Sequence, residues 1–216
     1  MIKLTLAIFL ISTFSACSFK TPPNQWQHKS INAFSSYTNN FLSSKETLAK
    51  NDLKRATEHA KSTADLSSLA RIYLGVCALN ISVGIDDRCL KYQDLRPTLK
   101  SDSLEAYYAL LTSNTKPDNI VLLPTQYQDF AQNLLDTQYS IANEDARNIK
   151  KTTSKIFAGA LLKEHIQEET IRDIIKSSSL HGYKKSVLYW LERLKHISKD
   201  KNEIEIINKK IEVINE

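Results

Sequence analysis

Glycine and proline are scarce in this chain of 216 residues, which has four glycines and five prolines. Together they make up about 4 % of the chain, against roughly 12 % in average usage. β-Sandwiches and β-barrels need turn residues at short intervals, so this scarcity argues against both. No two glycines lie closer than nine residues apart, which excludes the glycine-rich loops that cradle phosphate groups. The content of 42 % hydrophobic and 25 % charged residues still predicts a buried core.

The sequence also lacks an apolar run long enough to cross a membrane. Its most apolar stretch, residues 4–14, would form a helix of about 16 Å, half of a hydrocarbon core of about 30 Å. Lys3 precedes this stretch, and the small residues Ser15 and Ala16 follow it. A charged start, a short apolar segment and small residues before a cut are typical of a secretory signal.

A cysteine directly after these small residues changes the interpretation. The segment Phe14-Ser15-Ala16-Cys17 resembles the lipobox of bacterial lipoproteins. The resemblance implies a signal peptide over residues 1–16, cleavage before Cys17, and attachment of a diacylglycerol and a further acyl chain such as palmitate to Cys17. Residues 17–23 would then be the lipidated cysteine and a short tether, and residues 24–216 the folded domain. The alternative is ordinary signal cleavage, with Cys17 incidental.

The residues after Cys17 bear on the location of the protein. By analogy with enteric bacteria, Ser18 allows a lipoprotein to travel to the outer membrane, where the body would face the periplasm. The tether from Ser18 to Pro23 spans at most about 20 Å, so the body would lie close to the bilayer.

Two cysteines remain in the body, Cys77 and Cys89. An exported compartment permits disulfides, and Gly84 lies between the two in a position to end one helix. Cys89 is then expected in the first turn of the helical segment that returns along it. We therefore predict a Cys77–Cys89 disulfide that closes a loop of about 13 residues. The alternative is two independent buried residues. Because no histidine or second cysteine pair lies near them in the sequence, no zinc site is predicted.

The net charge of +5 is unevenly distributed along the chain. Residues 17–146 carry 13 basic and 14 acidic residues, whereas residues 147–201 carry 13 basic and 6 acidic ones. This basic stretch is either an ordinary solvated surface or a surface that attracts anionic headgroups or an acidic partner. Aromatic residues are not interleaved with the cations, so no nucleic-acid partner is expected.

Apolar residues recur every three or four positions through most of the body, the pattern of an α-helix. The clearest stripe joins Leu66, Leu69, Ala70, Tyr73, Cys77 and Ile81. Capping boxes, which mark helix starts, are expected at residues 43–46, 102–105 and 200–203. One long helix is expected from Thr125 to Ile141. Its junction with a further helical segment, near Asn143, is left open. The expected fold is all-α, as an irregular helical bundle or a short array of αα-hairpins with about eight to ten helices.

One segment resembles tetratricopeptide-like αα-repeats. The residues Leu74-Gly75 within segment 70–75 match the Leu-Gly of that motif's first helix. Other positions differ: Ala78 stands where the motif has an aromatic residue, and no repeat of about 34 residues is found. The resemblance therefore concerns the architecture alone.

No catalytic residue, metal ligand or cofactor is predicted, and the sequence leaves open whether the protein is an enzyme. The one candidate group is Glu164, His165, Glu168 and Glu169, in which two carboxylates lie one helical turn from an imidazole. Such a group is more often a solvated helix face with local charge pairs.

These observations predict a lipid-anchored, periplasm-facing helical protein that acts as an interaction scaffold or assembly factor for a cell-envelope complex. Its partners would be the membrane and an envelope protein, and its oligomeric state stays open. The alternatives are an enzyme that acts on the cell wall and a carrier of a small molecule or lipid. A carrier needs an enclosed apolar cavity, and an enzyme needs polar residues that converge in one cleft.

Overall fold

Helices form almost wherever the apolar spacing favours them in residues 25–216, the part of the chain that the computed structural model describes. That part contains twelve α-helices, three short 3₁₀-helices and no strand, so the all-α prediction is confirmed. The helices are α1 (Gln25–Leu42), α2 (Glu46–Lys61), α3 (Leu66–Ser82), α4 (Leu90–Leu95), η1 (Arg96–Thr98), α5 (Asp102–Leu111), α6 (Pro117–Ile120), η2 (Thr125–Tyr127), α7 (Gln128–Leu135), α8 (Tyr139–Asn148), α9 (Thr152–Leu161), η3 (Lys163–His165), α10 (Glu168–Leu180), α11 (Lys184–Ile197) and α12 (Lys201–Asn215).

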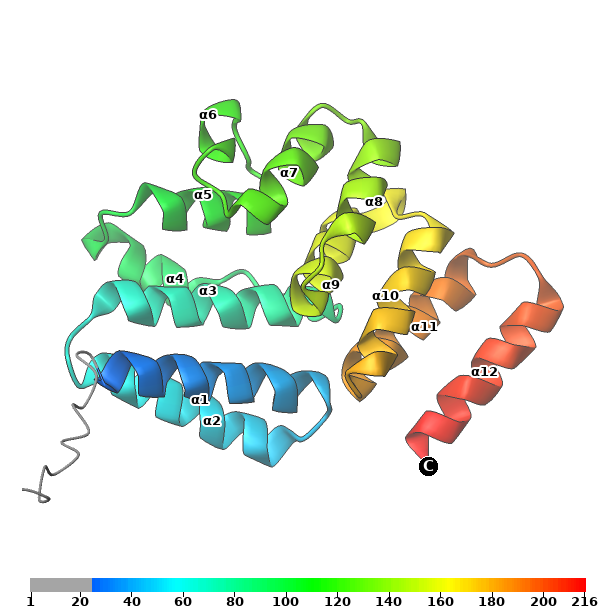
Figure 1. Cartoon of the computed structure of the whole chain (residues 1–216), viewed down its shortest axis with the longest axis horizontal. Coiled ribbons are helices and arrows are strands. Elements are labelled where there is room, and N and C mark those ends of the chain that lie inside the picture. The colour runs from blue at the N-terminus through cyan, green and yellow to red at the C-terminus, as the bar shows by residue number, and fades with distance from the viewer. Residues whose placement is uncertain (1–24) are drawn as a thin grey trace, which may run out of the picture.

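Consecutive helices run back and forth as antiparallel neighbours and form an irregular, curved array (Figure 1). Helix α3 lies in its middle, packed against α1, α2, α4, α5 and α9. The far end of α1 also reaches α11, where the Tyr183 hydroxyl donates a 2.9 Å hydrogen bond to the Asn39 side chain. This contact joins residues 144 positions apart and links the end of α1 to the start of α11.

Three helix starts were expected to carry capping boxes, and the structure supports only part of this. The Asp200 side chain accepts a 2.9 Å hydrogen bond from the backbone N–H of Asn202 and so caps α12. Helices α2 and α5 begin without any side-chain cap. Their expected partners Glu46 and Glu105 are engaged elsewhere, by Lys185 of α11 and by Arg96 respectively. Tertiary ion pairs thus replace the expected local ones.

The expected long helix from Thr125 to Ile141 is wrong, because the chain divides there into η2, α7 and α8. The break between α7 and α8 is a turn in which Thr137 has a positive φ of 57°. Asn143 does not mark a junction but lies fully buried within α8. Its amide donates to the backbone oxygens of Tyr139 and His165 and accepts from the backbone N–H of Gln167, at 2.8, 3.0 and 2.9 Å. A buried amide is therefore the link between α8 and the chain that leads into α10.

Two glycines have the roles that the sequence suggests. Gly75 lies inside α3 against the Phe34 ring of α1, and a Cβ atom there would collide with that ring. Gly84 directly follows α3 with a φ of +76°, a conformation that L side chains rarely adopt. The first glycine lets α1 approach α3 closely, and the second turns the chain back along α3.

Candidate functional site

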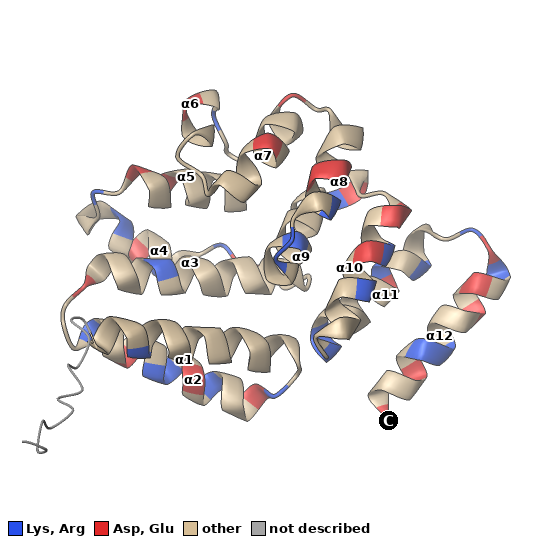
Figure 2. Cartoon of the chain, viewed as in Figure 1, with Lys and Arg blue, Asp and Glu red and all other residues tan. Residues whose placement is uncertain are grey.

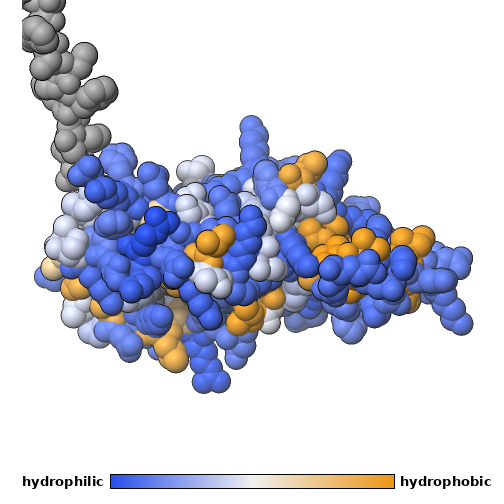
Figure 3. Space-filling model, turned by 90° about the horizontal axis from the view of Figure 1, so that it is seen from below, coloured by the Kyte–Doolittle hydropathy of each residue, from blue (hydrophilic) through white to orange (hydrophobic). Residues whose placement is uncertain are grey.

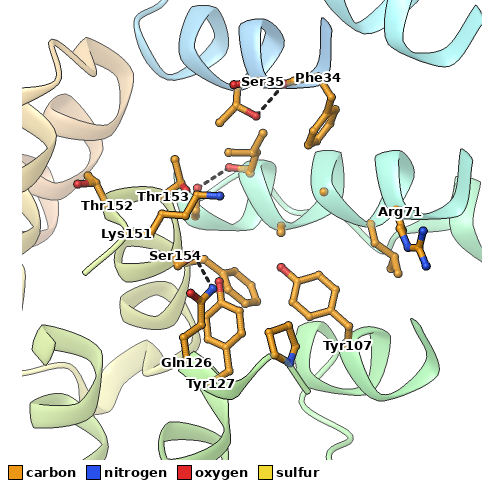
Figure 4. A pocket seen from close by; sticks show the side chains of 18 of the residues that line it. Phe34, Ser35, Arg71, Tyr107, Gln126, Tyr127, Lys151, Thr152, Thr153 and Ser154 are labelled. Atoms are coloured by element: carbon orange, nitrogen blue, oxygen red, sulfur yellow. Dashed lines mark hydrogen bonds between the residues drawn. The ribbon is translucent and has the colours of Figure 1, made fainter. Parts of the chain in front are cut away.

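A groove of about 860 Å³ lies on the side of α3 that faces α1, α5 and α9 (Figure 4). Its floor is formed by Gly75, Ala78 and Ser82, which follow one another at helical spacing on α3. Because these side chains are small, the floor is recessed between the flanking helices. From Arg71 to Ser82 the groove follows α3 for about 16 Å at 1.5 Å per residue. We call this the α3 groove.

One wall of the α3 groove is aromatic. Tyr107 of α5, Tyr127 of η2 and Phe157 of α9 form a cluster whose ring centroids lie 5.6 to 6.2 Å apart. Burial raises the pKa of both tyrosines, so their phenols stay protonated and neutral. Phe34 of α1 stands opposite this cluster. The wall therefore offers apolar surface and neutral hydroxyl groups rather than a nucleophile or a base.

The ends of the α3 groove are cationic. Lys151 lies just before α9 at one end, and Arg71 lies at the other, as Figure 4 shows. No aspartate or glutamate is among the residues that line the groove. Near Lys151 the Gln126 amide donates a 2.9 Å hydrogen bond to the Ser154 hydroxyl, which holds the loop before α7 against α9. The groove thus presents an apolar centre between two positive ends.

Cys77 and Cys89 lie together on another side of α3. The structure joins them in a disulfide, with their Cα atoms 5.3 Å apart. The expected geometry was different, because Cys89 was placed in the first turn of a returning helix. In the structure Cys89 precedes α4 with a φ of 54°, and Asp87 accepts a hydrogen bond from its backbone N–H. An extended loop, not a helix, brings Cys89 back to the level of Cys77.

The candidate group near the start of α10 is only partly assembled. The Glu164 carboxylate lies 3.5 Å from Nε2 of His165, whereas Glu169 pairs with Arg147 at 3.9 Å. The expected helical turn is interrupted, since η3 ends at His165 and α10 begins at Glu168. The His165 ring stacks on Tyr139 at 3.6 Å, and the Glu168 carboxylate pairs with Arg172 at 2.6 Å. Within residues 25–216 one cluster of potential metal ligands is found, Cys77 with Asp87 and Cys89. Its two sulfur atoms are bonded to each other, so they are not available as thiolate ligands.

Cys17, the predicted lipidation site, lies outside the described residues, as do the signal peptide and the tether. Within residues 25–216 no helix is long and apolar enough to cross a membrane.

Sequence reasoning missed the α3 groove. Its aromatic wall combines Tyr107, Tyr127 and Phe157, which come from three separate elements. Their positions along the chain differ by as much as 50 residues, and no local pattern brings them together. Gly75, Ala78 and Ser82 are small residues at helical spacing. The one available signal was this stripe of small residues on a strongly apolar helix.

No protein-family model matches the chain, and no match to it was found among curated proteins or solved structures.

Proposed function

We propose that the chain is a lipid-anchored interaction protein of the cell envelope that holds a segment of a partner protein in the α3 groove. The observation that carries this proposal is the apolar surface left open at the groove. Ile31 of α1 is 60 % exposed and Leu122 is 39 % exposed, and both line the groove. Apolar residues that gather around a hollow, rather than singly on a surface, mark binding sites for other molecules.

The charges of the α3 groove define the partner segment further. With Arg71 and Lys151 at its ends and no acidic residue in its lining, the groove favours an apolar segment that carries negative charges. Polar side chains such as Ser35 and Thr153 are available to the backbone of an extended segment, whose N–H and C=O groups have no internal partners. Over about 16 Å an extended chain has about five residues.

The anchor in this proposal is the acyl group on Cys17, with the outer membrane as its destination. Labelled palmitate is expected to enter the protein, and Cys17→Ser is expected to abolish the labelling and to leave the precursor uncleaved. Labelling that persists in this variant would contradict the lipoprotein interpretation, whatever the groove binds.

Site-specific photo-cross-linking tests the proposed role of the α3 groove. A photoreactive residue replaces Ile31 in the groove and, as the matched control, Leu180, which is 79 % exposed and does not line it. In intact cells we expect the probe at position 31 to form one discrete adduct that the probe at position 180 does not form. Sequencing of the adduct should identify an apolar segment with acidic residues. Adducts that are the same at both positions would refute the proposal.

A carrier of a small molecule is a second candidate, because pockets for such ligands have volumes of about 300 to 1,000 Å³. The α3 groove lies within this range. It is open to solvent rather than enclosed, since Ile31 at its rim is exposed. Native mass spectrometry of the purified protein separates the two functions, because a carrier would retain a bound molecule of constant mass.

A further inference from the structure

A second hollow, of about 750 Å³, lies between α2, α3 and the chain that enters α4. We propose that this surface binds the headgroups of anionic phospholipids and seats the body on a bilayer. We call it the basic surface and define it by five cations, which are Lys50, Lys54 and Lys61 of α2 with Arg88 and Lys91 beside the disulfide. It is separate from the α3 groove, with which it shares no lining residue.

The positive charge of the basic surface is largely uncompensated. Within residues 25–216 only Lys54 of the five cations forms an ion pair, an exposed one at 3.8 Å from Glu58. Two acidic residues also line the hollow, Asp86 and Asp87. The Asp87 carboxylate is occupied by hydrogen bonds of 2.7 Å from the Asn80 side chain and from the backbone N–H of Cys89. Five cations against these two carboxylates and that of Glu58 still leave a positive surface, which attracts an anionic one.

An apolar side chain stands among these cations. Leu90, the first residue of α4, is 62 % exposed and lines the same hollow. The lysines at positions 50 and 61 are separated by about 16 Å along α2, so the charges are spread rather than focused on one small ion. A spread of cations around one exposed leucine fits a lipid surface, where phosphates are distributed and apolar chains lie just beneath.

The basic surface extends along α2 to the end of the molecule where α1 begins, and Figure 2 shows the blue segments of α2 and α4 that belong to it. The Ser30 hydroxyl donates a 2.8 Å hydrogen bond to the backbone oxygen of Ala56. Because α1 and α2 are antiparallel, this register places Gln25 beside Lys61, within the 8 to 10 Å that separates packed helices. Cys17 precedes Gln25 by eight residues. If Cys17 is acylated, as the proposed function holds, the same end of the body is brought to the bilayer.

The distribution of charge along the chain pointed to a different segment. The basic stretch 147–201 carries most of the excess charge, but many of its cations are paired. Arg172 binds Glu168 and Glu203, Lys155 binds Asp173, and Lys185 binds Glu46. The basic surface belongs instead to residues 17–146, whose net charge is −1. Charges that are scattered in the sequence gather there because α2 and α4 pack on the same part of α3.

Fluorescence of an introduced tryptophan tests contact with lipid. Leu90→Trp is prepared in the full chain and reconstituted in vesicles that contain brominated phosphatidylcholine, with or without phosphatidylglycerol. Bromine quenches tryptophan on contact, and the signal of Trp26 and Trp190 is subtracted with the parent protein. We expect the tryptophan at position 90 to be quenched when phosphatidylglycerol is present, and we expect this quenching to disappear in 1 M NaCl. The control is Val121→Trp, at a position that is 74 % exposed and outside the basic surface, where we expect no quenching.

Charge variants locate the effect. In the Leu90→Trp protein, three cations are removed by Lys50→Gln/Lys61→Gln/Lys91→Gln. The ratio of protein whose basic surface contacts the bilayer to protein whose basic surface does not should then fall at least about tenfold. The matched control is Lys176→Gln/Lys184→Gln/Lys199→Gln, which removes the same charge elsewhere and should leave the ratio unchanged. Equal quenching without phosphatidylglycerol or in 1 M NaCl would overturn the proposal, as would equal losses in the two variants. The mass of the purified chain reports acylation separately, so a failed anchor is distinguished from a failed basic surface.

Discussion

Removal of the Cys77–Cys89 disulfide is expected to lower the thermal stability of the protein substantially. The bond joins residues 12 positions apart and so closes a loop of 13 residues. In the chain-entropy model such a cross-link stabilises the folded state by about 3 kcal/mol, because it restricts the unfolded chain. For a domain of this size 1 kcal/mol shifts the midpoint by about 2 to 4 °C, so the expected loss is about 6 to 12 °C.

The perturbation is best made in two independent ways, by reduction and by the double variant Cys77→Ala/Cys89→Ala. Melting curves followed by circular dichroism give the midpoints, and added reductant should not shift the variant any further. A trypsin digest under non-reducing conditions should contain the fragment 72–88 linked to the fragment 89–91, because trypsin cleaves after Arg71, Arg88 and Lys91. Two unlinked fragments, or equal midpoints with and without reductant, would show that the reasoning is wrong.

Three further predictions concern the body. Asn143→Leu should destabilise the fold by about 3 kcal/mol in urea unfolding, because it leaves buried backbone groups of the chain before α10 unpaired; an unchanged midpoint would contradict the role of this amide. Gly84→Ala should be more damaging than Gly182→Ala, since both residues have a positive φ but only the first would also collide with the Tyr189 ring; equal melting points would refute the steric argument. Burial, with smaller contributions from nearby carboxylates, raises the pKa of Tyr37 from 10 to about 12, so the folded state keeps this phenol protonated where the unfolded state ionises it. Its contribution to stability is complete below pH 10 and falls between pH 10 and about 12, and Tyr37→Phe should make the measured decline in unfolding free energy less steep.

The sequence predicted the helical class because apolar spacing is a local property. Helix ends were harder to predict, because a side chain that could cap a helix can instead pair with a residue that is remote in the sequence. Glu46 has the spacing of a capping-box residue, yet Lys185, 139 positions away, takes its carboxylate. Twelve helices are described where eight to ten were expected, because the expected long helix divides into α7 and α8 and because the four-residue α6 is too short for a periodic signal.

The candidate sites were less accessible to sequence reasoning than the fold. The even number of cysteines in the body and the position of Gly84 between them predicted the bond between Cys77 and Cys89. The segment that leads back to Cys89 was expected to be helical, but it is a loop. Both hollows beside α3 consist of residues from several elements, and their character follows from which side chains converge there. Counting charges along the chain therefore pointed to residues 147–201, although many of those cations are neutralised by partners in space.

The C-terminal helix α12 differs from the others in how it is held. It packs mainly against α11 and buries only Ile207 fully, while Ile206 and Val213 remain 57 % and 56 % exposed. Figure 3 shows apolar side chains gathered toward that end of the molecule. A helix that packs mainly against one neighbour unfolds at a lower free energy than one enclosed on several sides. Amide hydrogens of α12 should therefore exchange with solvent long before those of α3, and proteases should shorten the chain from this end while both hollows beside α3 stay intact.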